Sequence, residues 1–182
     1  NLTMKVIGFT GLPGSGKTTA VDAVRDLGKV VTMGDVIRKE TEKRGLKPTD
    51  KNLGNTARDL REQGGTIAIA RKCVELIEDF HCKVVFIDGI RSHDEVKVFK
   101  CNWDFQYIAI MVQDTLRFER IQARGRNDDP KTLEELRIRD AREIQFGIQE
   151  AIEKADFHVT NNSSEKEMKK KVREIVQNIL SN

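Results

Sequence analysis

The residue types best suited to chemistry stand near the start of the chain. Gly11, Gly16, Lys17 and Thr18 occupy the fixed positions of the pattern Gly-x-x-x-x-Gly-Lys-Ser/Thr, between an apolar run and a helical pattern. Glycines let a loop turn tightly enough for its backbone N–H groups to point at phosphate oxygens, and the following helix adds the positive end of its dipole. We expect Lys17 to reach the β- and γ-phosphates of ATP and Thr18 to hold Mg²⁺. The residues of this phosphate-binding loop (P-loop) expected to contact the nucleotide are Gly11, Leu12, Pro13, Gly14, Ser15, Gly16, Lys17, Thr18 and Thr19.

Acids and arginines follow two of the later apolar runs. Asp88 ends the run 84–88, where the carboxyl edge of a sheet would place it beside the P-loop, able to hold a water of the Mg²⁺ shell. Arg91 stands three residues after Asp88, as Arg38 stands three residues after Asp35. A guanidinium fork matches a phosphate group with two hydrogen bonds. The spacing predicts a second phosphate site, in which Asp35 orients either a metal-bound water or an acceptor hydroxyl.

The stretch 117–142 is rich in arginine. Arg120 and Arg124 are four residues apart and share one helix face, and Arg126 and Arg137 follow, so that both arms of a helix–turn–helix present cations. Phosphoryl transfer needs such groups to neutralise the charge on the moving phosphoryl group and to exclude water. The interleaved acids leave a second interpretation open, a salt-bridged face exposed to solvent. A nucleic-acid surface is disfavoured because the aromatic residues that would stack on bases are missing.

The elements that must position these residues alternate between two patterns. Short runs rich in Val, Ile and Phe are typical of buried parallel strands, and segments with apolar residues at helical spacing separate them. The alternation predicts a three-layer α/β P-loop kinase fold, with a five-stranded parallel sheet and helices on both faces. The predicted strands are 4–9, 29–32, 83–88, 105–112 and 157–160. The predicted helices are 17–27, 35–44, 50–63, 66–80, 93–100, 115–124, 132–155 and a last one that Ser164 begins.

Local signals refine these helices. Gly28 suits the C-cap of 17–27, and Asp114 can cap 115–124. Capping boxes are predicted at three helix starts, by Ser92 with Glu95, Thr132 with Glu135 and Ser164 with Glu167. The long helix 132–155 should bury one apolar stripe, formed by Ala141, Ile144, Ile148, Ile152 and Ala155.

Whole-chain properties exclude several function classes. A chain of 182 residues can form one domain with a sizeable core, and we interpret 1–182 as one P-loop domain with an acceptor-binding insert at 35–80 and a very short lid at 117–137. The net charge of +3 is too small to indicate nucleic acid by itself. No apolar run reaches the roughly 18 residues of a membrane span, and nothing resembles a signal peptide. Three cysteines without metal spacing suit reduced thiols. We therefore expect a cytoplasmic protein without a membrane partner, and residues 1–3, before Met4, to be remnants of an expression tag.

Together these motifs resemble the nucleoside monophosphate kinase superfamily over nearly the whole chain. The segment Thr32–Arg38 is similar to the adenylate kinase segment whose arginine holds the monophosphate. The segment Asp88–Arg91 is similar to that family's Asp-Gly-Phe-Pro-Arg, shortened by one residue. The resemblance implies that Arg38 and Arg91 hold the phosphate of the acceptor.

The arginine-rich stretch carries the same resemblance. The segment Arg120–Arg124 resembles the family motif that enters the lid, and Arg126-Asn127-Asp128-Asp129, with Arg137 beyond, resembles the motif that leaves it. The resemblance implies that Arg124, Arg126 and Arg137 contact phosphates during transfer. It also implies that Arg120 lies against the adenine of ATP.

The C-terminal part has a different likeness. The segment Ala155–Asn162 is similar to the Ala-Asp-x-x-Ile-x-Asn of dephospho-coenzyme A kinases, in which an acid after the second strand acts as the base, a role that falls to Asp35. As a whole, the chain resembles an archaeal family of adenylate-kinase-related, dephospho-coenzyme-A-kinase-like proteins. Two departures weigh against AMP as the acceptor: the motif at Asp88 lacks its proline, and no glutamine follows Arg91.

The favoured interpretation is therefore a small-molecule kinase. ATP·Mg²⁺ would be the donor, and a phosphate-bearing nucleotide or coenzyme, such as a nucleoside monophosphate or dephospho-coenzyme A, would be the acceptor. The alternative is a nucleotide-dependent regulatory or nucleic-acid-associated ATPase. The sequence leaves the acceptor open, and it is compatible with a monomer or a homodimer.

Overall fold

A parallel sheet of five strands forms the centre of the molecule, as predicted. The computed structural model describes residues 4–127 and 129–182; residues 1–3 and Asp128, for which the sequence suggested a tag remnant and part of a lid motif, lie outside the described residues. The strands run in the order β2-β3-β1-β4-β5, and every pairing is parallel. Their bounds are β1 Lys5–Thr10, β2 Lys29–Thr32, β3 Val84–Asp88, β4 Asp104–Met111 and β5 Phe157–Thr160.

The sheet register brings the ends of three strands together. Asp88 at the end of β3 pairs with Phe9 of β1 on one side and with Thr32 of β2 on the other. Because the strands are parallel, the segments that follow them leave the sheet at one edge. The P-loop after β1, the start of the insert after β2 and Arg91 after β3 are therefore neighbours.

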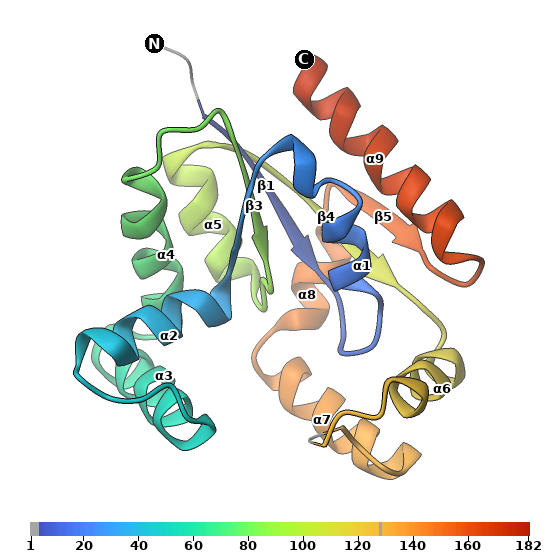
Figure 1. Ribbon diagram of the computed structural model, residues 1–182, viewed down its shortest axis with the longest axis horizontal. Helices are drawn as coiled ribbons and strands as arrows, with labels where there is room; N and C mark the ends of the chain where they lie inside the picture. Colours follow the sequence, from blue (N-terminus) through green and yellow to red (C-terminus); the bar gives the residue numbers. More distant parts are fainter. Residues whose placement is uncertain (1–3, 128) are drawn as a thin grey trace.

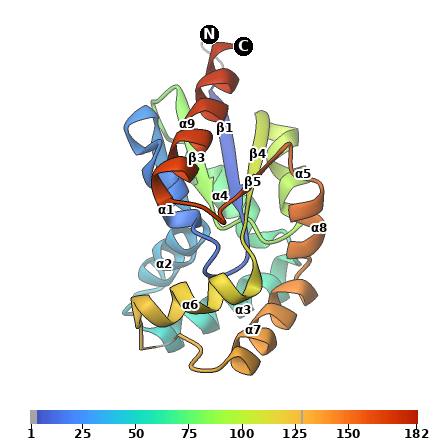
Figure 2. The ribbon, with the colours of Figure 1, turned by 90° about the vertical axis from the view of Figure 1, so that its right-hand side faces the viewer.

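Helices cover both faces of the sheet (Figures 1 and 2). Two apolar clusters are buried between the helices and the sheet. One cluster, with Ile7 and Phe86 from the sheet, packs against α1 and α9. The other, with Val6 and Val85, packs against α4, α5 and the insert. The helices are α1 Lys17–Asp22, α2 Met33–Lys43, α3 Asp50–Gly64, α4 Ala68–Glu78, α5 His93–Asn102, α6 Asp114–Arg124, α7 Leu133–Gln145, α8 Ile148–Glu153 and α9 Glu165–Ser181, with a short 3₁₀ turn at Arg25–Leu27. Among the described residues, no helix is long and apolar enough to cross a lipid bilayer.

The first predicted helix, 17–27, is shorter than expected. Its α-helical part ends at Asp22, and Gly28 is extended, with φ of −172°, instead of closing the helix in the left-handed conformation. A Cβ on Gly28 would lie 2.7 Å from the carbonyl oxygen of Val84. Gly28 therefore serves the close approach that leads the chain into β2, and the helix must end before it.

The predicted long helix 132–155 is also wrong, because it is two helices. Gly147 adopts a left-handed conformation, with φ of 95°, which ends α7 and lets α8 start in a new direction. Ile148 is buried as predicted, but Ala141 and Ile144 are exposed, Ile144 at 47%. The turn at Gly147 changes the direction of the chain, so Ala141 and Ile144 do not continue the stripe of α8, although Leu136 of α7 is buried at 1% exposure.

The capping residues predicted at three other helices are confirmed, but two of the predicted capping boxes are not closed, because Glu95 accepts from the backbone N–H of Arg91 and Glu135 from that of Lys131. The side chains of Ser92, Thr132 and Ser164 each accept a hydrogen bond from the backbone N–H three residues on. Asp114, however, is the first residue of α6 and caps nothing, since its carboxylate forms an ion pair with Arg117 at 3.1 Å.

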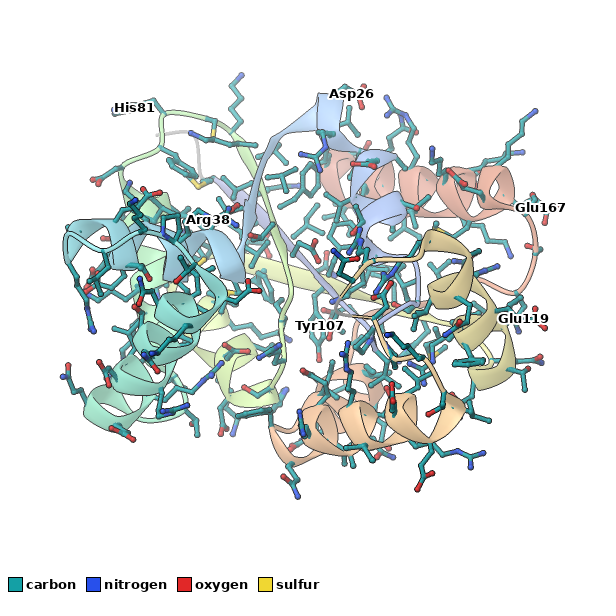
Figure 3. The ribbon with its side chains drawn as sticks, turned by 60° about the horizontal axis from the view of Figure 1, so that its bottom comes forward. Asp26, Arg38, His81, Tyr107, Glu119 and Glu167 are labelled. Carbon is teal, nitrogen blue, oxygen red and sulfur yellow. The ribbon has the colours of Figure 1, made fainter. Side chains whose placement is uncertain are left out.

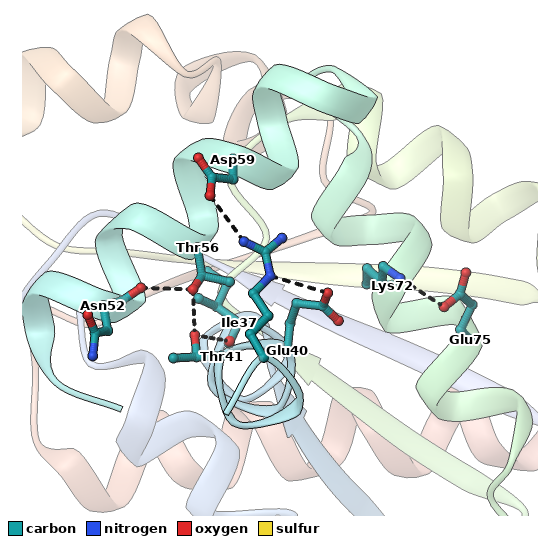
Figure 4. A network of polar contacts seen from close by, with 9 residues as sticks. Ile37, Glu40, Thr41, Asn52, Thr56, Asp59, Lys72 and Glu75 are labelled. Atoms are coloured by element: carbon teal, nitrogen blue, oxygen red, sulfur yellow. Dashed lines mark hydrogen bonds and ion pairs between the residues drawn. The ribbon is translucent and has the colours of Figure 1, made fainter. Parts of the chain in front are cut away.

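The insert is held together by a buried polar contact between α2 and α3 (Figure 4). The hydroxyl oxygens of Thr41 and Thr56 lie 2.8 Å apart, and each is also 2.8 Å from a carbonyl oxygen one turn back on its own helix. At the end of α2, Arg44 donates to Asp59 at 3.1 Å. These contacts between α2 and α3 favour an insert that keeps its own shape.

Candidate functional site

The P-loop connects β1 to α1 in a conformation that requires glycine. Gly14 and Gly16 have φ of 78° and 96°, in the left-handed region that other residues avoid. A Cβ on Gly16 would collide with the amide group of Asn161, whose Nδ2 donates to the carbonyl oxygen of Ser15 at 3.0 Å. Asn161 follows β5, an edge strand of the sheet, so the hydrogen bond from Asn161 ties the P-loop to the end of that strand. Asn161 belongs to the segment Ala155–Asn162 that carried a family likeness, but nothing in the sequence indicated this contact with the P-loop.

Two cavities meet at the P-loop and share Pro13 and Lys17. We call the larger one, of about 700 Å³, the donor cavity; it lies between the P-loop, α6 and the start of α9. The smaller one, of about 250 Å³, is called the acceptor cavity and lies between the loop, the insert and β3. The donor cavity is lined by residues 13–19, Arg120, Ile121, Arg124, Arg126, Asn161, Glu165 and Met168. The acceptor cavity is lined by Gly11, Pro13, Lys17, Thr32, Met33, Gly34, Ile37, Arg61, Ile69, Asp88, Gly89, Arg91, Glu95, Glu143 and Ile148.

Lys17, which the two cavities share, interacts with an opposite charge, that of Asp88 in the lining of the acceptor cavity. Burial lowers the pKa of Lys17, and the carboxylate of Asp88 partly opposes this shift. Burial likewise raises the pKa of Asp88, although the ammonium group of Lys17 pulls it back. Asp88 Oδ1 is buried and has no hydrogen-bond partner among the described residues. An unpartnered carboxylate oxygen beside a P-loop suits a cation or its bound water. The hydroxyl-bearing Thr18 is exposed at the start of α1.

Asp35 and Arg38 lie at the rim of the acceptor cavity rather than in its lining. The carboxylate of Asp35 accepts from the backbone N–H of Thr32 at 3.1 Å, while Thr32 Oγ1 accepts from the N–H of Asp35 at 2.9 Å. This capping box starts α2 at Met33. Asp35 directly follows Gly34, which does line the cavity. Arg38 pairs with Asp35 at 3.3 Å and is about half exposed.

The lid arginines are divided between the donor cavity and the surface. Arg120 donates to the carbonyl oxygen of Asn161 at 2.8 Å. Arg124 donates twice to Asp129, at 2.9 and 2.6 Å, and Asp129 also accepts from the backbone N–H of Arg126. Arg120, Arg124 and Arg126 line the donor cavity. Arg137 is exposed on α7 and lines neither cavity. Figure 3 shows Arg38 of the insert and Glu119 of α6 on opposite sides of the molecule.

Arg117 is buried, with only 2% of its side chain exposed, and connects the lid to the P-loop. Its guanidinium donates to the carbonyl oxygen of Pro13 at 2.8 Å and binds Asp140 of α7, at 3.1 Å through Nη1 and again through Nη2. The salt bridge joins α6 to α7, and the hydrogen bond to Pro13 joins α6 to the P-loop.

Breaking this buried pair should destabilise the protein strongly. We expect Asp140→Asn to lower the free energy of unfolding by about 3 kcal/mol, because Arg117 keeps its charge in a buried place. The matched control is Asp114→Asn, which removes an exposed partner of the same arginine and should cost less than about 1 kcal/mol. Urea denaturation followed by circular dichroism measures both. Equal effects of the two variants would show that Asp140 is not the main counter-ion.

Four residues of the acceptor cavity and lid were not singled out from the sequence: Arg61, Glu95, Glu143 and Arg117. Arg117 stood in the arginine-rich stretch, but nothing distinguished it from its exposed neighbours. Arg61, on α3, has no motif around it. Glu95 was expected only as part of a helix cap. A charged residue on an amphipathic helix has the same sequence pattern whether its side chain is buried or exposed.

Comparison with known proteins places these features in a family. Residues 7–146 match the family model described as "AAA domain". The chain is 42% identical to a "UPF0200 protein" of Methanosarcina mazei over 97% of the chain and 96% of that protein. It is 47% identical to a "UPF0200/UPF0201 protein" of Archaeoglobus fulgidus over its full length, but it spans only 58% of that relative.

Solved structures show the same fold at low identity. The shikimate kinase of Bacteroides thetaiotaomicron superposes with a TM-score of 0.64 at 16% identity, covering 99% of each chain. At this identity the likeness concerns the fold alone, that of a P-loop kinase.

Proposed function

The chain belongs to the UPF0200 family of archaeal P-loop proteins, and from this premise we propose that it is an ATP-dependent phosphotransferase. The acceptor we propose is a small phosphate-bearing molecule of the nucleotide or coenzyme type, used in the cytoplasm. One observation carries the proposal: two separate cavities meet at Lys17, the residue whose charge faces the transferred phosphates in P-loop enzymes. A binding protein or a simple ATPase has no need of the second cavity.

In the proposed reaction, an oxygen of the acceptor forms a bond to the γ-phosphorus of ATP, the bond to the β-phosphate oxygen breaks, and ADP leaves. Lys17 lines both cavities, and its ammonium group neutralises negative charge on the β- and γ-phosphates between them. Arg124, Arg126 and Arg137 supply cations from the lid, and Arg120 lies against the adenine. Asp35 and Arg38 meet the acceptor at the rim of its cavity, where Asp35 takes the proton if the accepting group is a hydroxyl.

Mg²⁺ is the expected companion of the donor. The residues fit it, because Asp88 offers a buried carboxylate oxygen without a partner and Thr18 offers an exposed hydroxyl. The bound cation would supply charge neutralisation on the donor phosphates. Asp88 would hold it through water, and Thr18 directly.

A product assay tests the proposal. ADP formation from ATP·Mg²⁺ is measured alone and with nucleoside monophosphates, dephospho-coenzyme A, RNA or DNA. Stimulation by a small acceptor, with the acceptor recovered carrying one more phosphate, is the expected result. Stimulation by RNA or DNA, or ADP formation with no acceptor product, would instead support the regulatory ATPase.

The lid arginines should act on the reaction step. We expect Arg124→Ala and Arg126→Ala each to lower kcat at least about tenfold while KM for ATP changes less, because these cations meet the phosphate charge mainly in the closed state. In the resting protein Arg124 is held by Asp129, so it must exchange partners on closure. Steady-state kinetics, with the exposed Arg142→Ala on α7 as control, measures this. A rise in KM with kcat untouched would show ground-state anchors.

A further inference from the structure

Two arginines of the acceptor cavity share one aromatic ring. Arg61 comes from α3 and Arg91 from the turn after β3, and both line the cavity. Their guanidinium carbons lie 5.1 Å and 5.8 Å from the ring centre of Phe146, which stands between α7 and α8. Cation–π contacts of this length orient a guanidinium without occupying its N–H donors. The ring therefore holds two like charges close together, with donors left for a ligand.

Two carboxylates hold Arg91 in place. Glu95, only 5% exposed, accepts from the backbone N–H of Arg91 at 2.8 Å and so fixes the turn. Glu143 of α7 contacts the guanidinium of Arg91 at 3.1 Å. Burial and the neighbouring Arg91 lower the pKa of Arg61, and Glu95 and Glu143 only partly oppose this shift. The two guanidinium groups repel each other across the ring, and an anion bound between them would relieve this repulsion.

We propose that Arg61 and Arg91 form an anion clamp that binds a carboxylate or phosphate group of the acceptor, which displaces Glu143 from Arg91. The inference rests on the proposed function, since it assigns a group of the same acceptor. It adds Arg61, which no sequence motif had indicated, and it leaves Arg38 at the rim. Because Glu143 is on α7, its release also couples binding of the acceptor to the lid.

The size of the cavity narrows the acceptor further. Its volume of about 250 Å³ is below the roughly 300–1,000 Å³ usual for small-molecule sites. Ile37, Ile69 and Ile148 form its apolar wall. The cavity thus suits a small anionic group beside a compact apolar part of the acceptor, and the rest of a larger acceptor, such as a coenzyme, would extend beyond it.

Calorimetry with simple anions tests the clamp without knowledge of the acceptor. The P-loop is first filled with a non-hydrolysable ATP analogue and Mg²⁺, so that the probe meets only the acceptor cavity. Inorganic phosphate and acetate are then titrated separately, which shows whether the clamp prefers a phosphate or a carboxylate. We expect one saturable anion per chain, and at least about tenfold weaker binding in Arg61→Ala and in Arg91→Ala, as for a lost charged hydrogen bond.

Three further variants sharpen the result. Arg61→Lys should recover only part of the affinity, because lysine lacks the planar fork. Glu143→Gln should bind the anion several-fold more tightly, since it removes the competing carboxylate. Arg58→Ala, an exposed arginine one turn before Arg61 that lines neither cavity, should bind like the wild type.

The clamp is overturned if neither phosphate nor acetate binds saturably to the wild type, or if binding survives unchanged in the folded Arg61→Ala or Arg61→Lys protein. Weaker binding in Glu143→Gln would overturn the displacement of Glu143. Because the titration involves no turnover, its outcome is independent of the product assay. Anion binding without phosphoryl transfer would support the clamp and contradict the proposed kinase activity. Phosphoryl transfer without anion binding would support the kinase activity and contradict the clamp.

Discussion

Replacing Lys17 by alanine is expected to lower the rate of phosphoryl transfer by at least about 100-fold, the usual effect of removing a group that faces charge in the transition state. Lys17 is a residue common to both cavities, so its charge lies on the path between donor and acceptor. ATP binding should weaken as well, because the same ammonium faces the β- and γ-phosphates before the reaction.

Loss of activity in this variant should not reflect loss of the fold. Burial lowers the pKa of Lys17, so the folded protein already disfavours its charge, and its removal should leave Tm within a few degrees of the wild type. Lys47→Ala, an exposed residue in the turn between α2 and α3, is the matched control. Turnover of ATP at the wild-type rate by folded Lys17→Ala would show that the P-loop is not the catalytic centre.

Asp88→Asn should lower the rate of phosphoryl transfer and raise the stability of the protein. The rate of Mg²⁺-dependent transfer should fall at least about 100-fold, because the amide cannot hold the water of the cation as a carboxylate does. At the same time the ligand-free protein should become more stable at neutral pH. Burial raises the pKa of Asp88, and the attraction of Lys17 does not cancel this, so the folded protein binds the proton more tightly than the unfolded chain does.

The sign of the pH dependence follows from that difference. Stability linked to Asp88 is fully present below the ordinary aspartate pKa of about 3.9 and is lost as the pH rises through the raised value. The asparagine variant has no such loss. Its Tm should exceed that of the wild type near pH 7, and the gap should close as the pH falls toward about 4. Thermal scans across this range measure it, with Asp104→Asn, exposed at the start of β4, as control. A wild-type protein more stable than the variant at neutral pH would contradict the argument.

The sequence predicted the five strands and the parallel sheet well, because strands depend on local patterns. Each strand is a continuous apolar run, so its position could be found residue by residue, and the alternation of strands with helices allows few arrangements of a parallel sheet. Helix ends were less predictable. Gly147 ends α7 by its left-handed backbone, whereas Gly28 is extended, and the residue type alone does not distinguish the two conformations.

The candidate site also has a part that follows from local sequence and a part that depends on tertiary packing. The P-loop is contiguous, and its glycines, Lys17 and Thr18 act through their order along the chain, so the sequence by itself determined the nucleotide-binding segment. The acceptor cavity is assembled from elements far apart in the chain, and only the tertiary structure decided that Arg61 lies beside Arg91 and Phe146, and that Asp35 lies outside the lining of this cavity. The physical reason is that an arginine on an amphipathic helix has the same pattern whether it faces solvent or a cavity. Its partners decide its role, and those partners come together only when the sheet, the insert and α7 pack.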